Sequence, residues 1–422
     1  MTLDWSRMKA VVLESDDWGL CAWSADEQAC RVLADLPVFR GPHAFRYAGS
    51  TLESAADVRR IAETLLEFRG ADGFPPVLQA NTVMASPDYV RLRPPAFECE
   101  GLPLVDYPQS PSRWTRPGLW GEVVAARELG VWWPELHGLH HLPETAWLHA
   151  LRQGADDARR AFDQQSPVCD AVARSSEYDP TEPVELRRRN LEGAVRRFRS
   201  LFGRDATSFC PPDYRWDDAV EAEAVKLGVS IFQGRAERTA GALPRVRHFL
   251  GRFRFPHFEG PRFYPPPRIA FEPGADPEES SRLGVDAVHR GVRAAWAREQ
   301  PAIVSTHRAN YVQIDPARGA AGLERLRELL TRLSEEGATF LTDAEVHSLV
   351  TRGWSARAIS SRGMLVRNRG ARAKPVRIPR PAGVDQVTVR QGRVHDAEAR
   401  VEGDEVVLWC DAGEVLIEWR RA

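Results

Sequence analysis

The sequence predicts an α/β protein built on a parallel sheet or barrel, followed by a small antiparallel β module. From residue 10 to about residue 345, short apolar runs alternate with amphipathic segments, as is typical of strand–helix repeats in parallel sheets. After residue 363 the pattern changes to short β-branched runs separated by turns that contain Gly. We therefore expect a barrel domain over residues 1–350 and a small β domain over residues 363–422.

The first half of the predicted barrel opens with a continuous apolar run that ends in two acidic residues. Its predicted strands are 10–14, 75–81 and 132–136, and its predicted helices are 54–69, 119–129 and 143–163. Residues 98–118 are rich in Pro, Ser and Arg, and we expect them to form a loop over the site.

The second half repeats the alternation with shorter strands. Its predicted helices are 183–202, 217–227, 277–298 and 319–336, and its predicted strands are 207–210, 229–232, 302–306 and 339–342. In parallel α/β folds, functional residues gather at the carboxyl ends of the strands. Tyr214 and His307 follow predicted strands of this half, so we expect both at that end.

Composition excludes several classes of function. The 422 residues carry 57 basic and 59 acidic side chains, a net charge of -2, which gives no general attraction to nucleic acid or to an anionic membrane. Six Cys are scattered without a C-x-x-C pair, which argues against a zinc ribbon and a disulfide framework. The start of the sequence lacks the pattern of a signal peptide, and no apolar run reaches the ~18 residues of a membrane span. We expect a soluble cytoplasmic protein, whose oligomeric state the sequence leaves open.

Two motifs together predict a metal site. Asp16 and Asp17 follow the first apolar strand, and His137 and His141 follow the short run at 132–136. A catalytic zinc-like ion takes three protein ligands and keeps one position for water, and helical geometry would place the two His one turn apart on one side. Taken alone, an Asp pair is often a helix cap or a turn, and a His pair is often a surface or packing feature. The combination favours a divalent ion held by one Asp and two His, with the second Asp free as a base.

These motifs resemble those of the polysaccharide deacetylases, the NodB homology fold. Glu14-Ser15-Asp16-Asp17-Trp18-Gly19 resembles their first motif, His137-Gly138-Leu139-His140-His141 resembles H-x-x-x-H, and Ser305-Thr306-His307 resembles their last motif. With Gln79–Asp88 and Ser-Thr-His-Arg-x-Asn-Tyr, the set looks like a bacterial branch of that superfamily over residues 10–345.

The resemblance implies a distorted parallel (β/α) barrel that removes N- or O-acetyl groups from sugars with a divalent metal, best matched by Zn²⁺. It implies Asp17, His137 and His141 as metal ligands, Asp16 as the base and His307 as the acid. Contacts to a carbohydrate or other small substrate are expected from residues near the strand ends, although each of these side chains could equally pack or form a turn: Trp18, Asn81, Tyr214, Arg308 and Tyr311.

The chain also departs from the family pattern. In the third motif, where Arg-x-Pro-Tyr is usual, it has Cys210-Pro211-Pro212-Asp213, and Arg215 or Arg308 could replace the missing Arg. The fourth, Asp/Trp motif has no convincing counterpart. Two other functions therefore stay open, an amidohydrolase acting on a cyclic or linear non-sugar amide and a non-catalytic carbohydrate-binding barrel.

Overall fold

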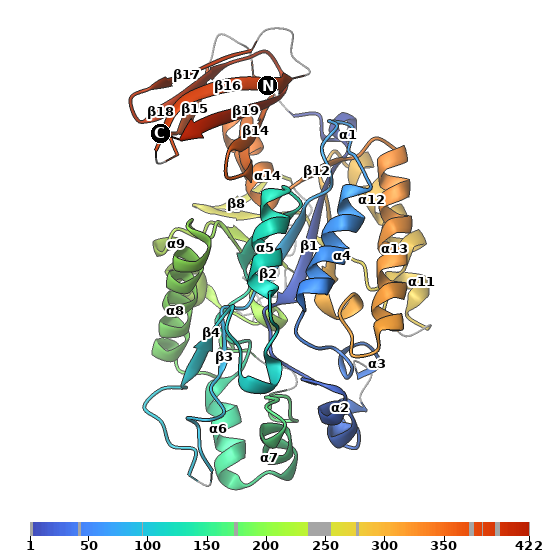
Figure 1. The fold of residues 1–422 in the computed structure, drawn as a ribbon, viewed down its shortest axis with the longest axis vertical. Coiled ribbons are helices and arrows are strands. Elements are labelled where there is room, and N and C mark those ends of the chain that lie inside the picture. The colour runs from blue at the N-terminus through green and yellow to red at the C-terminus, as the bar shows by residue number, and fades with distance from the viewer. Residues whose placement is uncertain are drawn as a thin grey trace.

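A large, mostly parallel sheet forms the centre of the molecule (Figure 1). The computed structural model describes residues 3–40, 44–94, 96–172, 176–234, 255–275, 278–370, 375–381, 383–392 and 397–421. The sheet has ten strands in the order β10-β11-β1-β2-β5-β6-β7-β9-β8, with β12 also paired to β1. Their bounds are β1 Ala10–Trp18, β2 Leu78–Thr82, β5 Trp132–Leu136, β6 Ser208–Phe209, β7 Ile231–Phe232, β8 His257–Glu259, β9 Arg262–Tyr264, β10 Arg268–Ala270, β11 Ala302–His307 and β12 Thr339–Leu341.

Strand β1 is the organising element of this sheet. All nine of its residues are buried, because neighbouring strands flank it and both of its faces are covered, as expected for a strand in a parallel sheet. Its register with β11 pairs Asp16 directly with His307. The register alone therefore brings the first and last predicted site motifs together.

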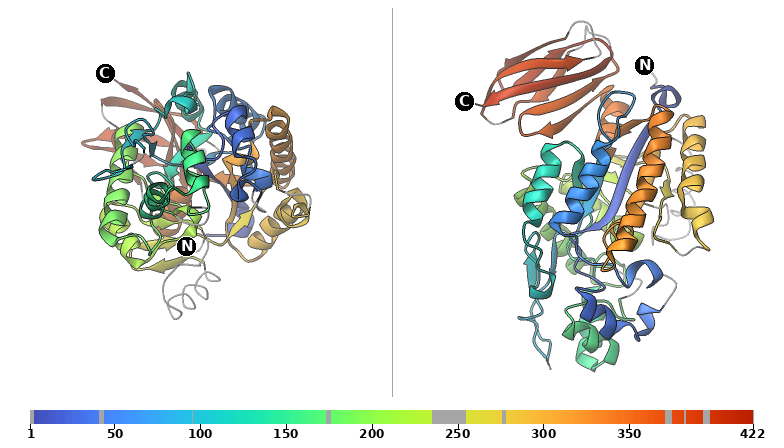
Figure 2. Two further views of the ribbon diagram at one scale, coloured as in Figure 1. Left: turned by 90° about the horizontal axis from the view of Figure 1, so that it is seen from below. Right: turned by 45° about the vertical axis from the view of Figure 1, so that its right-hand side comes forward.

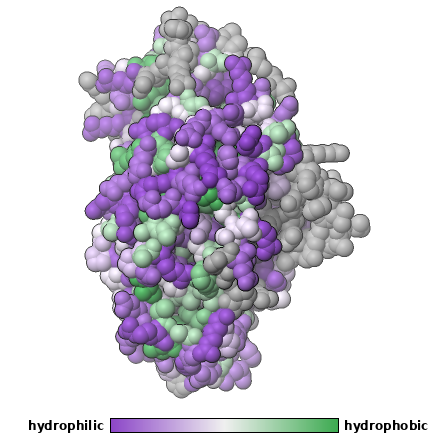
Figure 3. All heavy atoms as spheres, turned by 90° about the vertical axis from the view of Figure 1, so that its right-hand side faces the viewer, coloured by the Kyte–Doolittle hydropathy of each residue, from purple (hydrophilic) through white to green (hydrophobic). Residues whose placement is uncertain are grey.

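Helices surround the sheet, as the view from below shows (Figure 2). The main helices are α4 Ala55–Leu66, α5 Leu119–Glu128, α8 Val184–Phe202, α9 Asp218–Lys226, α12 Val285–Ala297, α13 Pro316–Glu335 and α14 Asp343–Arg352. Helix α13 buries Leu326, Leu330 and Leu333, and the outer face of this side of the molecule is largely hydrophilic (Figure 3). Among the described strands, no pairing joins β10 to β8, so the predicted parallel barrel is confirmed in a distorted, open form.

Smaller elements lie beyond the carboxyl ends of the strands. They are α2 Glu27–Leu33, η1 Pro37–Phe39, α3 Ala44–Tyr47, the hairpin of β3 Ala85–Pro87 and β4 Leu104–Asp106, η2 Ser112–Trp114, α6 Glu144–Gln153, α7 Asp156–Asp163, η3 Pro212–Tyr214 and η4 Arg308–Asn310. The predicted loop at 98–118 thus contains a strand and a helical turn. The remaining helices are α1 Trp5–Met8 and α11 Ser280–Leu283.

Two predicted helices are interrupted. The helix expected over 143–163 is α6 and α7, because Gly154 ends α6 in a left-handed conformation with φ 75°. The helix expected over 277–298 is α11 and α12, which meet at the extended Gly284; residue 277 lies outside the described residues. Helix α13 begins earlier than the expected residue 319, because Asp315 caps it and Pro316 occupies its first turn.

The antiparallel C-terminal strands form two sheets at the end of the barrel opposite the carboxyl ends of its strands (Figures 1 and 2). One sheet has the order β13-β14-β19-β16 and the other β15-β18-β17. Their bounds are β13 Trp354–Ser360, β14 Gly363–Asn368, β15 Val376–Pro379, β16 Val384–Gly392, β17 Glu398–Glu402, β18 Glu405–Trp409 and β19 Gly413–Arg421. The first sheet therefore begins before residue 363.

Buried ion pairs attach this β module to the barrel. Arg367 contacts Asp72 at 2.6 Å and also Glu345, and Arg357 lies 3.1 Å from Glu345. Arg357 also donates to the main-chain oxygen of Gly130, just before β5. These contacts hold the module at the amino ends of the strands, away from the predicted site. Among the described residues, no helix combines the length and the apolar composition that a membrane span requires.

Candidate metal and catalytic site

Asp17, His137 and His141 converge at the carboxyl ends of β1 and β5. The Oδ1 atom of Asp17 lies 3.3 Å from Nε2 of His137 and 3.6 Å from Nε2 of His141. Asp17 has a left-handed backbone with φ 75°, and the β1–β2 register shifts between Ser15 and Trp18. This irregularity lets two successive Asp side chains serve one site, although neighbouring side chains of a regular strand face opposite ways.

The segment that carries both His is a loop, so the predicted helix is wrong. Gly138 has φ 103° and His141 has φ 58°, values outside the right-handed helical region. The main-chain oxygens of Gly138 and Leu139 instead accept hydrogen bonds from Met84 and Ala85, at 3.2 and 2.7 Å. A spacing of four residues brings the two rings together in either geometry, and the glycine in the motif permits the loop.

The donor set fits a divalent ion. One ligand atom from each of Asp17, His137 and His141 lies within 4.8 Å of the other two. Nδ1 of His137 donates to the main-chain oxygen of Cys210 at 2.8 Å, which directs Nε2 at Asp17. Burial opposes ionisation of Asp17, but the hydrogen bond with His137 and the nearby His charges hold its pKa well below the usual value. The group offers one carboxylate and two imidazoles, a donor set that zinc commonly takes.

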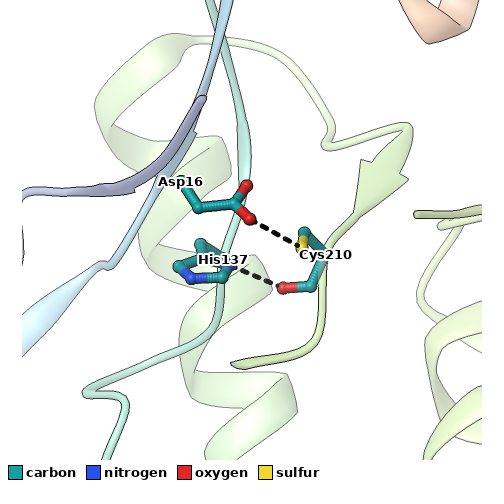
Figure 4. Close-up of side chains that lie close together, drawn as sticks. All are labelled: Asp16, His137 and Cys210. Carbon is teal, nitrogen blue, oxygen red and sulfur yellow. Dashed lines mark hydrogen bonds between the residues drawn. The ribbon is translucent and has the colours of Figure 1, made fainter. Parts of the chain in front are cut away.

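A second cluster shares His137 but fits a metal less well. The Sγ atom of Cys210 lies 3.6 Å from Oδ2 of Asp16, beside His137 (Figure 4). Burial raises the pKa of the Cys210 thiol well above its usual value, whereas a metal needs the thiolate. Asp16 also already accepts hydrogen bonds from Asn81 and Arg268. Of the two clusters, the Asp17 group therefore offers the donors better suited to a divalent ion.

Arg268 holds Asp16 in place. From β10, its Nη1 and Nη2 atoms donate to the two oxygens of Asp16 at 2.6 and 3.1 Å, and its Nε atom contacts Glu14. Asn81 donates to Oδ1 of Asp16 at 2.6 Å. Burial alone would raise the pKa of Asp16, but the Arg268 charge and the nearby imidazoles lower it well below the usual range. Asp16 is therefore ionised and rigidly oriented.

Neither Arg suggested by the sequence takes this position. Arg215 pairs with Asp179, and Arg308 pairs with Glu53 at 2.9 Å. Arg268 was missed because it belongs to a strand of three residues preceded by three prolines, a segment with no recognisable strand pattern.

His307 is held from the opposite side by Glu272, another residue that the sequence did not single out. Nδ1 of His307 lies 2.5 Å from Oε1 of Glu272, while Nε2 lies 3.9 Å from Oδ2 of Asp16. Burial favours the neutral ring, but the charge and hydrogen bond of Glu272 outweigh it and raise the pKa of His307 to about 9. Asn310 also donates to Glu272, at 2.7 Å. At neutral pH this ring is therefore an imidazolium.

Most of the predicted substrate residues are buried in other roles. Trp18 is 1% exposed and packs edge-on against Trp132, so it offers no face to a sugar. Arg308 is 1% exposed against Glu53. Tyr311 is also 1% exposed, and its hydroxyl lies 2.9 Å from that of Thr306.

The other two predicted substrate residues adjoin the site. Asn81 is fully buried and orients Asp16. Tyr214 is half-buried, and its hydroxyl accepts from Arg268 at 2.8 Å. Its main-chain N–H donates to Pro211, so it is already used within η3. Half-buried Tyr47, from α3, adds an edge-on contact to His307 at 6.0 Å and stacks on Trp23, and neither residue had a sequence signal.

Comparison with known proteins finds matches among solved structures only. No family model matches the sequence, and no curated protein matches it. Among solved structures, a CE4 family pseudoenzyme from Bacillus anthracis is 12% identical with a TM-score of 0.34, over 81% of this chain and 66% of that chain. A Mycobacterium smegmatis protein predicted to be a polysaccharide deacetylase is 12% identical with a TM-score of 0.39, over 81% and 89%.

A third similar structure, the carbohydrate deacetylase Agd3, is 9% identical with a TM-score of 0.39, over 97% of this chain and 65% of that chain. The chain thus spans slightly less than two thirds of the Bacillus anthracis protein and of Agd3. Similarity at this level identifies no site residue.

Proposed function

We propose that this chain is a metal-dependent hydrolase that removes an N- or O-acetyl group from a carbohydrate. One arrangement carries the proposal: the buried carboxylate of Asp16 and the imidazole of His307 flank a group of potential metal ligands. Asp16 and His307 come from paired positions of adjacent strands, and each is fixed by a separate buried partner, Arg268 or Glu272. A site that only binds a sugar has no need of a base and an acid held in these states.

In this proposal Asp17, His137 and His141 hold the divalent ion, and Zn²⁺ suits two nitrogen ligands and one oxygen ligand. When bound, such an ion lowers the pKa of water and polarises a carbonyl group. Asp16 accepts the proton of the attacking water, and His307 donates a proton to the departing nitrogen or oxygen. The acetyl group leaves as acetate.

The two protonation states are compatible over a wide pH range. Asp16 is ionised at neutral pH because its pKa is lowered, and His307 is protonated because its pKa is raised to about 9. Base and acid are therefore both in the required form near neutrality without exchanging a proton first. Arg268 prevents Asp16 from turning away, which supports the positioning that hydrolysis requires.

The carbohydrate part of the proposal rests on the motif resemblance, with Tyr214 as the remaining predicted substrate contact. A panel of acetylated sugars, cyclic amides and linear amides, assayed with elemental analysis of the purified protein, tests it. We expect close to one zinc-like ion per chain and release of acetate from at least one acetylated sugar. Hydrolysis of amides alone would replace the carbohydrate assignment with the amidohydrolase.

The binding-only alternative needs its own test. We expect Asp16→Asn to bind the same sugar as wild type but to release no measurable acetate. A wild-type protein that binds an acetylated sugar and its metal, yet turns over no member of the panel, would favour the non-catalytic barrel.

A further inference from the structure

A buried carboxylate, Glu177, contacts the main chain of the loop that carries the two candidate His ligands. The side chain of Glu177 is fully buried. Its Oε1 atom accepts from the main-chain N–H groups of Leu139 at 2.8 Å and His140 at 3.4 Å, and its Oε2 atom accepts from Leu142 at 3.1 Å. Three main-chain N–H groups of the histidine loop are thus directed at one carboxylate.

Gly138 fits this arrangement closely. A Cβ atom at Gly138 would lie 2.4 Å from Oε1 of Glu177, and the residue has φ 103°. The glycine therefore admits both the turn after β5 and the close approach of the carboxylate. Because a non-helical loop leaves its N–H groups without helical partners, a buried acceptor is needed to satisfy them.

We propose that Glu177 is a positioning residue for divalent-metal binding, which fixes the spacing between His137 and His141 through the main chain of their loop. This inference rests on the proposed function and extends it to a residue outside the ligand set. Charged hydrogen bonds to three N–H groups hold the loop more firmly than neutral ones would. His137 is independently fixed by Cys210, so the loop chiefly determines where the half-buried ring of His141 lies.

The test compares two buried glutamates of the same segment. Glu177→Gln removes the charge and places an amide NH₂ group against donors of the loop. Glu182→Gln is the matched control, because Glu182 is 4% exposed and accepts from the main-chain N–H of Thr145, in the first turn of α6. The dissociation constant for Zn²⁺ is measured on metal-depleted full-length protein by chelator competition, and the unfolding temperature of the same metal-free samples is recorded.

We expect Glu177→Gln to weaken Zn²⁺ binding by about 10–100-fold, the usual effect of losing an outer partner of a ligand. Glu182→Gln should bind Zn²⁺ as wild type does, even if its unfolding temperature falls by a similar amount. A purely structural role would lower the unfolding temperature without this difference in affinity. Equal Zn²⁺ affinity in Glu177→Gln and wild type, or an equal loss in Glu182→Gln, would overturn the proposal.

Glu177→Asp covers the case in which Glu177→Gln does not fold. It keeps the charge but is one methylene shorter, so it cannot reach all three N–H groups at once, and we expect an intermediate loss of affinity. Wild-type affinity in Glu177→Asp would then overturn the proposal. Wild-type protein that binds no Zn²⁺ would overturn both this inference and the proposed function, whereas Zn²⁺ binding without turnover of any acetylated sugar would overturn the proposed function alone.

Discussion

Replacing Glu272 by Gln should lower the pKa of His307 and shift the loss of activity at high pH. Glu272 contacts Nδ1 of His307 at 2.5 Å and is the largest cause that raises this pKa. The carboxylates of Asp16 and Asp17 also act on the ring and remain in the variant. The pKa of His307 should therefore fall substantially, because burial, which favours the neutral ring, is then opposed mainly by Asp17 and Asp16.

The magnitude follows from the raised pKa. A rise from 6.5 to about 9 corresponds to about 3 kcal/mol of added preference for the charged ring. Because the folded pKa exceeds the unfolded one, this stability is fully present below about pH 6.5 and is lost as the pH rises through about 9. Glu272→Gln should remove the larger part of this preference for the charged ring, so the pKa of His307 should fall by roughly 1–2.

The direct assay is an NMR titration of the His307 ring in metal-free protein, followed by pH–rate profiles of the loaded enzyme. The high-pH limb of the wild-type profile should move to lower pH in Glu272→Gln. Glu53→Gln is a suitable control, because Glu53 is also a buried glutamate but is paired with Arg308. This substitution should leave the pKa of His307 unchanged. An unchanged His307 pKa in Glu272→Gln would refute the assignment of Glu272 as its main partner.

Four further substitutions test the separate roles at the site. Asp17→Ala should lose both bound metal and activity, whereas Asp16→Asn should keep the metal and lose roughly 10²–10⁴-fold in rate; equal metal loss in elemental analysis would show that the two roles are shared. Arg268→Lys keeps the charge but loses one of the two hydrogen bonds to Asp16. It should lower the free energy of unfolding in urea by about 2 kcal/mol and reduce the activity. Wild-type values of both would contradict the proposed role of Arg268 in orienting Asp16. Gly138→Ala places a methyl group 2.4 Å from Oε1 of Glu177 and should weaken Zn²⁺ binding at least 10-fold in chelator competition. Unchanged Zn²⁺ affinity would show that the loop can shift to accommodate the methyl group.

The sequence correctly predicted that Asp16, Asp17 and His307 meet at one edge of the sheet, and their roles as base, ligand and acid stay predictions. Asp16, Asp17 and His307 follow apolar strands, and parallel pairing brings such strand ends to one edge of a sheet. The conformation of the histidine loop was not predictable in this way. A four-residue spacing suits a helix equally well, and the buried carboxylate that stabilises the loop lies far along the chain, at Glu177.

The partners that set the charge states were also beyond sequence patterns. Arg268 and Glu272 lie close together in the chain, in and just after a strand of three residues, so no period marks them. They reach Asp16 and His307 only because β10 pairs with β11, which in turn pairs with β1. Residue type likewise did not reveal that Trp18 is a core residue, since an aromatic side chain next to a motif can stack on a ligand or pack inside.

The interior of the barrel explains why Asp16 has a fixed orientation. Gln233, the residue after β7, accepts from both Asn81 and Arg268 at 2.7 Å, and both of these residues also donate to Asp16. Gln233 in turn donates to Ser208 at 2.7 Å. Side chains associated with β2, β6, β7 and β10 therefore support the Asp16 carboxylate, and its rotation would break hydrogen bonds within a buried network. The polar interior thus maintains the geometry that Asp16 would need to take a proton from water, without the carboxylate having to reorganise during the reaction.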